Sequence, residues 1–235
     1  MMREVNLKVG LTPRHQCSYL PGRQEQLLVL LDKELLCPLG YERLLSAGFR
    51  RSGSDIYRPH CQSCHACESL RIDVARFAPS RGQKRITRLN RDIRVRVNEQ
   101  DKPEYFRLYQ LYINERHRDG AMYPASRQQY DGFLLCHWLP PVFVEFWLEQ
   151  RLVAIAVTDL LGNALSAMYT FYDPDLEHRS LGTFAILSQL RLAAELNKEW
   201  LYLGYQVDDC KKMSYKQHFR PHQRLVAGQW LAMKD

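Results

Sequence analysis

Apolar positions recur at spacings of three and four between Phe184 and Ala194, a pattern typical of a helix with one buried face. A helix that begins in the preceding turn, residues 180–183, leaves its first amide hydrogens free to bind an anion or a carbonyl. The next run, residues 200–207, is short and rich in aromatic and aliphatic side chains, which predicts a buried strand, although periodicity alone does not distinguish it from a buried helix. Gly204 interrupts this run, and a glycine in a strand lets a ligand or another backbone approach closely.

The middle of the chain alternates strand-like and helix-like patterns. Ile93, Val95 and Val97 alternate with polar residues, which predicts a half-buried strand. One helix is expected to begin near Pro103 and a second at Ser126, which residues 138–141 would stop. Three strand-like runs follow at residues 142–148, 152–161 and 164–172. The turns between them are short enough for an antiparallel meander.

The first part of the chain is less regular. Residues 1–24 carry proline and glycine in loop-like positions. Residues 24–36 look helical, although their apolar run would also fit a strand. Residues 41–47 read as a short helix closed by Gly48, and Phe49 opens an extended segment rich in arginine, serine and glycine.

The order of these elements predicts an α+β protein with an acetyltransferase-type N-acyltransferase fold. In that arrangement the helix after the third meander strand points its N-terminus at an acyl donor. The strand that carries Gly204 diverges from its neighbour and leaves a cleft between them. Residues 1–80 are expected to form a cysteine-containing N-terminal subdomain, and residues 81–235 the transferase domain. The alternative is a generic α+β domain without a catalytic cleft.

The charge of the chain is positive and clustered. Its 235 residues carry a net charge of +7, and the sequence pI is about 9.1. Seven basic residues lie between Arg81 and Arg96 against a single acid, Asp92. A second segment mixes cations with rings: Lys211, Lys212, Tyr215, Lys216, His218, Phe219 and Arg220. Such clusters favour a polyanionic partner such as a nucleic acid, although the first would also fit a solvated linker helix.

Targeting signals and cysteine usage point to a cytoplasmic protein. The N-terminus shows no secretory signal, and the longest apolar run near it, residues 27–31, is far too short to cross a membrane. Seven cysteines, an odd number, argue against a disulfide framework and for metal binding, redox sensitivity or burial.

Three of the thiols, in the motif CQSCHAC at residues 61–67, are spaced so that they could converge on one ion. The predicted ligands are Cys17, Cys61, Cys64 and Cys67, with Cys17 ahead of His60 or His65 as the fourth. The metal would be zinc or an iron–sulfur cluster. The alternative is a thiol-rich turn without metal. The remaining cysteines, Cys37, Cys136 and Cys210, are expected to be buried.

Several stretches resemble the arginyl-tRNA–protein transferase family almost from end to end. The most specific are YLGY at residues 202–205, CKKMSYK at 210–216 and FRP at 219–221. Others are YRPHC at 57–61, YQLY at 109–112, RH at 116–117, DLL at 159–161, SAMY at 166–169, FYDP at 171–174 and SLG at 180–182. The short length and the CQSCHAC motif resemble the bacterial branch that transfers leucine to proteins beginning with Asp or Glu. The eukaryotic branch has a Cys-x-x-Cys pair where this chain has Cys17 and Leu20, so the metal or haem chemistry of that branch is not carried over.

The resemblance implies that leucine moves from leucyl-tRNA to the α-amine of an acidic N-terminal residue, which marks that protein for degradation. Arginyl-tRNA is the alternative donor. The ester is already activated, so positioning and oxyanion stabilisation suffice and no cofactor is required. A coenzyme A-dependent N-acyltransferase is less well supported, because its Q/R-x-x-G-x-G/A loop is replaced here by residues 177–182 with one glycine. A non-catalytic RNA-binding or zinc module is a further alternative, which would not explain the acidic and aromatic strands.

Candidate roles follow for individual residues. Asp159 and His117 are the predicted catalytic groups, one orienting the acceptor α-ammonium or taking its proton, the other shuttling a proton. The predicted substrate-binding residues are Leu181, Gly182, Thr183, Gly204 and Tyr205, with Arg71, Arg116 and Lys216 as candidate cations for the acceptor carboxylate. The predicted tRNA contacts are Lys84, Arg85, Arg88, Arg91, Lys211 and Lys212.

Overall fold

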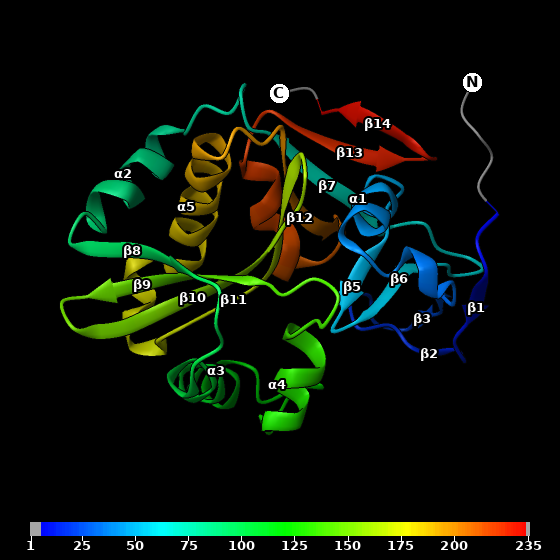
Figure 1. Ribbon diagram of the computed structural model, residues 1–235, viewed down its shortest axis with the longest axis horizontal. Helices are drawn as coiled ribbons and strands as arrows, with labels where there is room; N and C mark the ends of the chain where they lie inside the picture. The colour runs from blue at the N-terminus through cyan, green and yellow to red at the C-terminus, as the bar shows by residue number, and fades with distance from the viewer. Residues whose placement is uncertain (1–5, 234–235) are drawn as a thin grey trace.

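The computed structural model, described over residues 6–233, is built on one large mixed sheet (Figure 1). Its eight strands run in the order β14-β13-β7-β12-β11-β10-β9-β8. Their bounds are β7 Glu68–Asp73, β8 Ile93–Asn98, β9 Val142–Leu148, β10 Arg151–Leu160, β11 Ala164–Tyr172, β12 Trp200–Gln206, β13 His222–Val226 and β14 Gln229–Ala232. The N-terminal part adds a four-stranded sheet of β1 Val9–Leu11, β4 Leu27–Leu30, β6 Asp55–Pro59 and β5 Arg50–Ser52, and a ribbon of β2 His15–Gln16 and β3 Gln24–Glu25.

Helices cover both faces of the large sheet (Figure 1). They are α1 Pro38–Ser46, α2 Arg81–Leu89, α3 Pro103–Arg116, α4 Arg127–Leu134 and α5 Leu181–Glu195, with 3₁₀ segments η1 Lys33–Leu35, η2 Pro174–Arg179 and η3 Lys211–His218. Phe184 and Leu190 of α5 pack on one face, together with α2. Tyr109 of α3 and Leu134 of α4 pack on the opposite face. The α+β class predicted from the sequence is confirmed.

Two neighbouring strands separate in the middle of the sheet. β11 and β12 run parallel and pair only from Ala164 opposite Trp200 to Ser166 opposite Tyr202. Beyond this point β11 stays paired with β10, while β12 stays paired with β7. We call the opening between the diverging strands the fork. Gly204 lies on its β12 side with φ +79°, next to a register shift in the pairing with β7.

Most of the predicted elements are present. The helix expected after residue 183 is α5, the strand expected at 200–207 is β12, and the three-stranded meander is β9 to β11. The helix expected over residues 24–36 is wrong, because β4 in this segment is held between β1 and β6. The second predicted helix ends at Leu134, earlier than the prolines that were expected to stop it.

The predicted domain boundary at residue 80 lies between β7 and α2. β7 precedes this boundary but belongs to the large sheet, where it pairs with β12 and β13. Tyr41 of α1 and Ile56 of β6 share a core cluster with Ala164 and Tyr202 of the large sheet. The subdomain division therefore stays a prediction, with a packed core across it. Across residues 6–233, no helix is both long and apolar enough to span a bilayer.

Candidate functional site

A pocket of about 960 Å³ lies where the N-terminal strands meet the large sheet. Its wall includes Tyr57 of β6, Ser69 of β7 and Tyr205 of β12. The loops that carry the cysteines and the β13–β14 turn complete the lining. Its size and mixed lining are those of a typical ligand pocket, and it borders β12, one arm of the fork.

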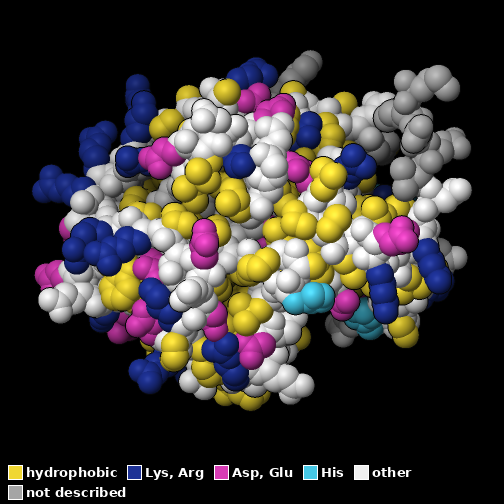
Figure 2. All heavy atoms as spheres, viewed as in Figure 1, with side chains coloured by type: hydrophobic (Ala, Val, Ile, Leu, Met, Phe, Trp, Pro, Cys, Tyr) yellow, Lys and Arg dark blue, Asp and Glu magenta, His cyan; other side chains and the backbone are white. Residues whose placement is uncertain are grey.

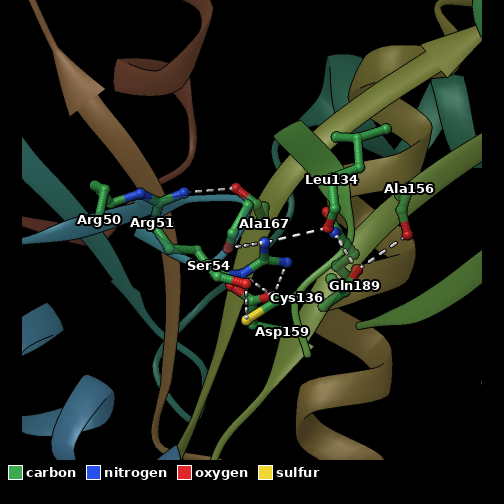
Figure 3. Close-up of polar contacts among 11 residues, drawn as sticks. Arg50, Arg51, Ser54, Leu134, Cys136, Ala156, Asp159, Ala167 and Gln189 are labelled. Carbon is green, nitrogen blue, oxygen red and sulfur yellow. Dashed lines mark hydrogen bonds and ion pairs between the residues drawn. The ribbon is translucent and has the colours of Figure 1, made fainter. Parts of the chain in front are cut away.

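Arg50 occupies the fork itself (Figure 3). It begins β5, pairs in register with Tyr57 and is only 6% exposed. Its Nη2 donates a hydrogen bond of 2.9 Å to the carbonyl of Ala167, the first β11 residue beyond the paired segment. A Cβ built on Gly204 would lie 3.6 Å from the same guanidinium. The side chain therefore spans from one diverging strand to the other.

The adjacent Arg51 has an acid partner, Asp159 (Figure 3). Its Nε and Nη2 donate to Asp159 Oδ1 at 2.9 and 2.5 Å, and both side chains are fully buried. Nη1 donates to the carbonyls of Gly53 and Leu134. Arg51 thus ties β5 to β10 through Asp159 and to α4 through Leu134, and Asp159 does not line the pocket. Its predicted catalytic role stays a prediction, while this geometry supports a structural one.

Lys216 of η3 is a second buried cation beside the fork. It is 7% exposed, and its Nζ donates a 2.5 Å hydrogen bond to the carbonyl of Tyr205. Burial, and then the charge of Arg50, lower the pKa of Lys216 to about 7. The Tyr205 hydroxyl donates to the carbonyl of Gly48 at 2.9 Å, which fixes the chain just before Arg50.

The start of α5 has the free amides that the sequence predicted. Ser180 precedes the helix with φ +53°, and its side chain makes no capping hydrogen bond. Gly182 lies against the ring of Tyr172 at the far end of β11, with a built Cβ 3.7 Å from the ring. Tyr172 lies five residues beyond Ala167 along the strand, roughly 16 Å away. Gly182 of α5 therefore lies near the far end of β11, whereas Gly204 of β12 faces β11 at Ala167 across the Arg50 side chain.

The other two candidate cations are engaged by protein groups. The Arg71 guanidinium lies between Trp200 and Trp230, 3.7 and 4.2 Å from the ring centroids, and donates to Gln223 and the Tyr202 hydroxyl. Arg116 pairs with Glu177 at 2.9 Å near Tyr172. Only Lys216, of the three candidates, lies at the fork.

His117 ends α3 and packs edge-on against Tyr112, with ring centroids 4.9 Å apart. Burial lowers the pKa of His117, and the nearby Lys212 and Arg116 lower it further. A neutral imidazole beside η3 is compatible with its predicted role as a proton carrier, which stays a prediction.

Exposed basic side chains gather on α2 and β8 (Figure 2). All of the predicted tRNA contacts, Lys84, Arg85, Arg88, Arg91, Lys211 and Lys212, are exposed. The α2 segment is tied to η3, because Gln83 Nε2 donates to the carbonyl of His218 at 3.0 Å. The two basic segments that the sequence singled out are thus in direct contact.

The four predicted thiol ligands line the same pocket. Cys61 and Cys64 form a backbone bridge, and the Sγ of Cys17 accepts hydrogen bonds of 3.4 Å from two backbone amides. Burial, and then the neighbouring Cys17, Cys61 and Cys64, raise the pKa of Cys67 to about 12. The thiols suit zinc or iron–sulfur chemistry in kind, but no three His, Cys, Asp or Glu residues within 6–233 are grouped to hold a metal. Cys136 and Cys210 are buried as expected, whereas Cys37 is only half-buried and caps α1.

Arg50 was not among the residues predicted for the site. The signal was present, because two consecutive arginines on a strand must point to opposite faces, so at least one points inward. The sequence does not show which of the two arginines pairs with an acid, because that acid, Asp159, is on β10, more than 100 residues away.

Two family models match the chain. The model described as "Arginine-tRNA-protein transferase, N terminus" matches residues 15–85, and the one described as "Arginine-tRNA-protein transferase, C terminus" matches residues 104–226. Two relatives, from Aeromonas hydrophila subsp. hydrophila and Pseudoalteromonas atlantica, are 62% and 54% identical. The alignments cover 98% and 97% of this chain and 97% and 100% of the relatives. Both relatives are named aspartate/glutamate leucyltransferase.

Among solved structures, the L-PGS of Bacillus licheniformis gives a TM-score of 0.46 at 14% identity, over 71% of this chain and 49% of that chain. This likeness is too low to carry an argument about the fold.

Proposed function

The chain belongs to the arginine-tRNA-protein transferase family, and from that premise we propose that it transfers leucine from leucyl-tRNA to the α-amine of proteins beginning with Asp or Glu. The donor and acceptors follow the name that its relatives share. The product would carry an N-terminal leucine, which marks it for degradation by the N-degron pathway. Such an enzyme acts where charged tRNA is available, in the cytoplasm.

The observation that carries this proposal is the fork. Two parallel strands that separate, connected in the chain by a helix with uncapped first amides, form the reaction cleft of an acetyltransferase-type fold. Here β11 and β12 separate after Ser166, and α5 begins against Tyr172 at the other end of β11. The amides of Leu181, Gly182 and Thr183 are suited to hold the terminal ribose or ester carbonyl. The leucyl ester would then extend along β11 into the fork.

The reaction forms one bond and breaks another. The acceptor α-ammonium first loses a proton, and its nitrogen then attacks the carbonyl carbon of the leucyl ester. The carbon–nitrogen bond forms, the ester carbon–oxygen bond breaks, and the ribose hydroxyl leaves with the second amine proton. Because the ester is already activated, positioning the amine and stabilising the developing oxyanion supply the catalysis. The chain's own residues suffice for these steps, and no covalent enzyme intermediate is needed.

The exposed cations of α2 and η3 support the tRNA part of the proposal. Phosphate contacts supply most of the affinity for a nucleic acid, and aromatic rings hold unstacked bases. Tyr215 lies on η3 between Ser214 and Lys216, and its ring is 44% exposed. The link between Gln83 and His218 connects this segment to α2. A tRNA bound on α2 would therefore reach the fork through η3.

The thiols of Cys17, Cys61, Cys64 and Cys67 would hold a metal, if one is bound, beside the pocket. Zinc bound there would fix the loops that line the pocket, and an iron–sulfur cluster would add redox sensitivity. Elemental analysis of anaerobically purified protein tests this prediction. One equivalent of zinc or stoichiometric iron would support metal binding, and the absence of both metals would contradict it.

The function is tested by incubating the protein with radiolabelled leucyl-tRNA, arginyl-tRNA or acetyl coenzyme A and with peptides that begin with Asp, Glu or Ala. We expect label on the Asp and Glu peptides from leucyl-tRNA. Transfer from arginyl-tRNA alone would assign the arginyl activity instead. Transfer from acetyl coenzyme A alone would refute the proposal.

A further inference from the structure

Arg50 is a buried cation without a counter-ion. Its Nη1 is buried and makes no hydrogen bond, and among the described residues no carboxylate forms an ion pair with it. The neighbouring Arg51 is also a buried guanidinium, but its charge is balanced by an ion pair with Asp159. Burying a charge without a partner is costly, so a position like that of Arg50 persists where a ligand completes it.

A second cation adds to this imbalance. The charge of Lys216 lies near enough to Arg50 to be affected by it, and its Nζ has a backbone carbonyl as its hydrogen-bond partner. The other groups that act electrostatically on Lys216 are the thiols of Cys210 and Cys67, with no carboxylate among them. Among the described residues, neither Arg50 nor Lys216 forms an ion pair with a carboxylate, although Glu25 lines the neighbouring pocket and acts on the hydroxyls of Tyr19 and Tyr57.

The surroundings of Arg50 are aromatic and hydroxylated. The Arg50 charge acts on the hydroxyls of Tyr19, Tyr57 and Tyr205, and all three of these residues line the pocket. On the other side, the absence of a side chain at Gly204 leaves the β12 backbone bare toward the guanidinium. Such a setting suits a small anion that enters beside the tyrosines, because hydroxyls and a guanidinium can all donate to it.

We propose that Arg50, assisted by Lys216, binds the side-chain carboxylate of the acceptor's N-terminal Asp or Glu and so determines which proteins receive the amino acid. The inference rests on the proposed function, which supplies an acidic acceptor. A planar guanidinium pairs with a carboxylate through two parallel hydrogen bonds. The acceptor carboxylate is joined to the reacting amine by a short side chain, so its partner must lie beside the reaction centre, where Arg50 lies.

A tRNA phosphate fits this position less well. Phosphates along a nucleic acid are met by exposed cations, and α2 and η3 supply those at the surface. Arg71 and Arg116, the other candidates for the acceptor, are already engaged by Gln223 and Glu177. The geometry thus moves the predicted acceptor site from these two residues to Arg50 and Lys216.

The test compares two peptides that differ only in the first residue, Asp or Asn. With leucyl-tRNA as donor, kcat/KM is measured for each peptide with the wild-type protein and with Arg50→Gln. We expect the wild type to prefer Asp, and Arg50→Gln to lose on the order of 100-fold with Asp and at most a few-fold with Asn, because only Asp offers a carboxylate to pair. An equal loss of kcat/KM with both peptides would show that Arg50 contacts the donor or stabilises the transition state, and it would overturn the inference. An Arg50→Gln variant that prefers Asp over Asn as strongly as the wild type would overturn it too.

Two further variants keep the result interpretable. Arg191→Gln removes one exposed charge from α5, where the side chain is 83% exposed, and should leave both values unchanged. Arg50→Lys keeps a buried cation but cannot form two parallel hydrogen bonds, so its Asp preference should lie several-fold below that of the wild type. If Arg50→Gln does not fold, as judged by circular dichroism, an Arg50→Lys preference equal to the wild type overturns the inference. If the wild type transfers leucine to neither peptide, the proposed function itself fails.

Discussion

At the scale of single residues, the two adjacent arginines of β5 separate structure from function. The charge of Arg51 is balanced by Asp159 inside the protein. Arg50 donates only to a backbone carbonyl, through Nη2, and its Nη1 has no hydrogen-bond partner. The difference follows from the strand geometry, which turns successive side chains to opposite faces. One face meets an acid on β10, and the other meets the fork.

Asp159→Asn tests the structural role of Asp159. Removing the carboxylate leaves Arg51 buried without a counter-ion, which should lower the free energy of unfolding by about 3 to 5 kcal/mol. Urea unfolding measures this loss. Asp208→Asn is the control, because its pair with Arg224 is at the surface and should cost at most about 1 kcal/mol. Unchanged stability together with lost transfer would instead support the catalytic role predicted from the sequence.

Lys216 should make stability depend on pH. Its folded-state pKa of about 7 lies below its ordinary value, so above pH 7 the unfolded chain binds more protons than the folded chain. Burying the charged Lys216 therefore lowers the free energy of unfolding, and this loss is fully present below pH 7. Above pH 7 the loss decreases, by up to about 1.4 kcal/mol per pH unit.

The measurement compares the wild type with Lys216→Met by urea unfolding at pH 6.5, 7.5 and 8.5. The groups that act electrostatically on Lys216 are Arg50 and the thiols of Cys210 and Cys67. The stability advantage of the Met variant should shrink as pH rises. A difference that does not change with pH would show that Lys216 remains charged in the folded protein.

At the scale of elements, the fork requires a bare backbone at Gly204. Gly204→Ala places a side chain in the left-handed region, which costs about 1 to 2 kcal/mol, and puts a methyl 3.6 Å from Arg50. Gly22→Ala is a matched control, with φ +72° and nothing within 4 Å of the added carbon, at a position that does not line the pocket. Thermal unfolding should show similar losses for both, while leucine transfer should fall only in Gly204→Ala. Equal transfer in the two variants would contradict a substrate-facing Gly204.

The helix α2 should contribute to tRNA binding through salt-sensitive contacts. Replacing Lys84, Arg85 and Arg88 by Gln should reduce the slope of log affinity against log salt by about 2 to 3. The affinity is measured by filter binding of tRNA between 50 and 300 mM salt, about the range in which phosphate contacts weaken. Lys33, Arg43 and Arg191, replaced together, remove the same number of exposed charges outside the basic segments. A loss of slope shared equally by both triple variants would show that the contact is not specific to α2.

The sequence predicts regular elements better than it predicts the site. The period of α5 and the meander are local patterns, and both are present in the structure. The strand predicted at residues 93–98 is β8, but its predicted half-buried face is wrong, because Val95 and Val97 are 42% and 49% exposed. The apolar run in residues 24–36 suits either a helix or a strand, and only the pairing of β4 with β1 and β6 makes it a strand. Gly204 and Lys216 were recognisable from their sequence contexts. The role of Arg50 was not, because Arg50 contacts the fork at Ala167, more than 100 residues away in the sequence.

At the scale of the whole molecule, three parts meet at the fork. The N-terminal strands supply Arg50, the large sheet supplies the diverging β11 and β12, and η3 supplies Lys216. The contact from Gln83 to His218 joins the basic α2 surface to η3. This arrangement lets a large, charged donor bind at the surface while its esterified end enters the interior. The N-terminal part is therefore needed for the site itself.

The most direct test of the account is the position of the donor's leucyl group. A crystal structure should be determined with a short 3′-terminal RNA that carries leucine through a stable amide bond, together with a peptide beginning with Asp. The account predicts that the leucyl carbonyl lies in the fork between Ala167 and Gly204, with the Asp carboxylate on Arg50 Nη1. A leucyl group bound elsewhere, with Arg50 still without an anion, would contradict it.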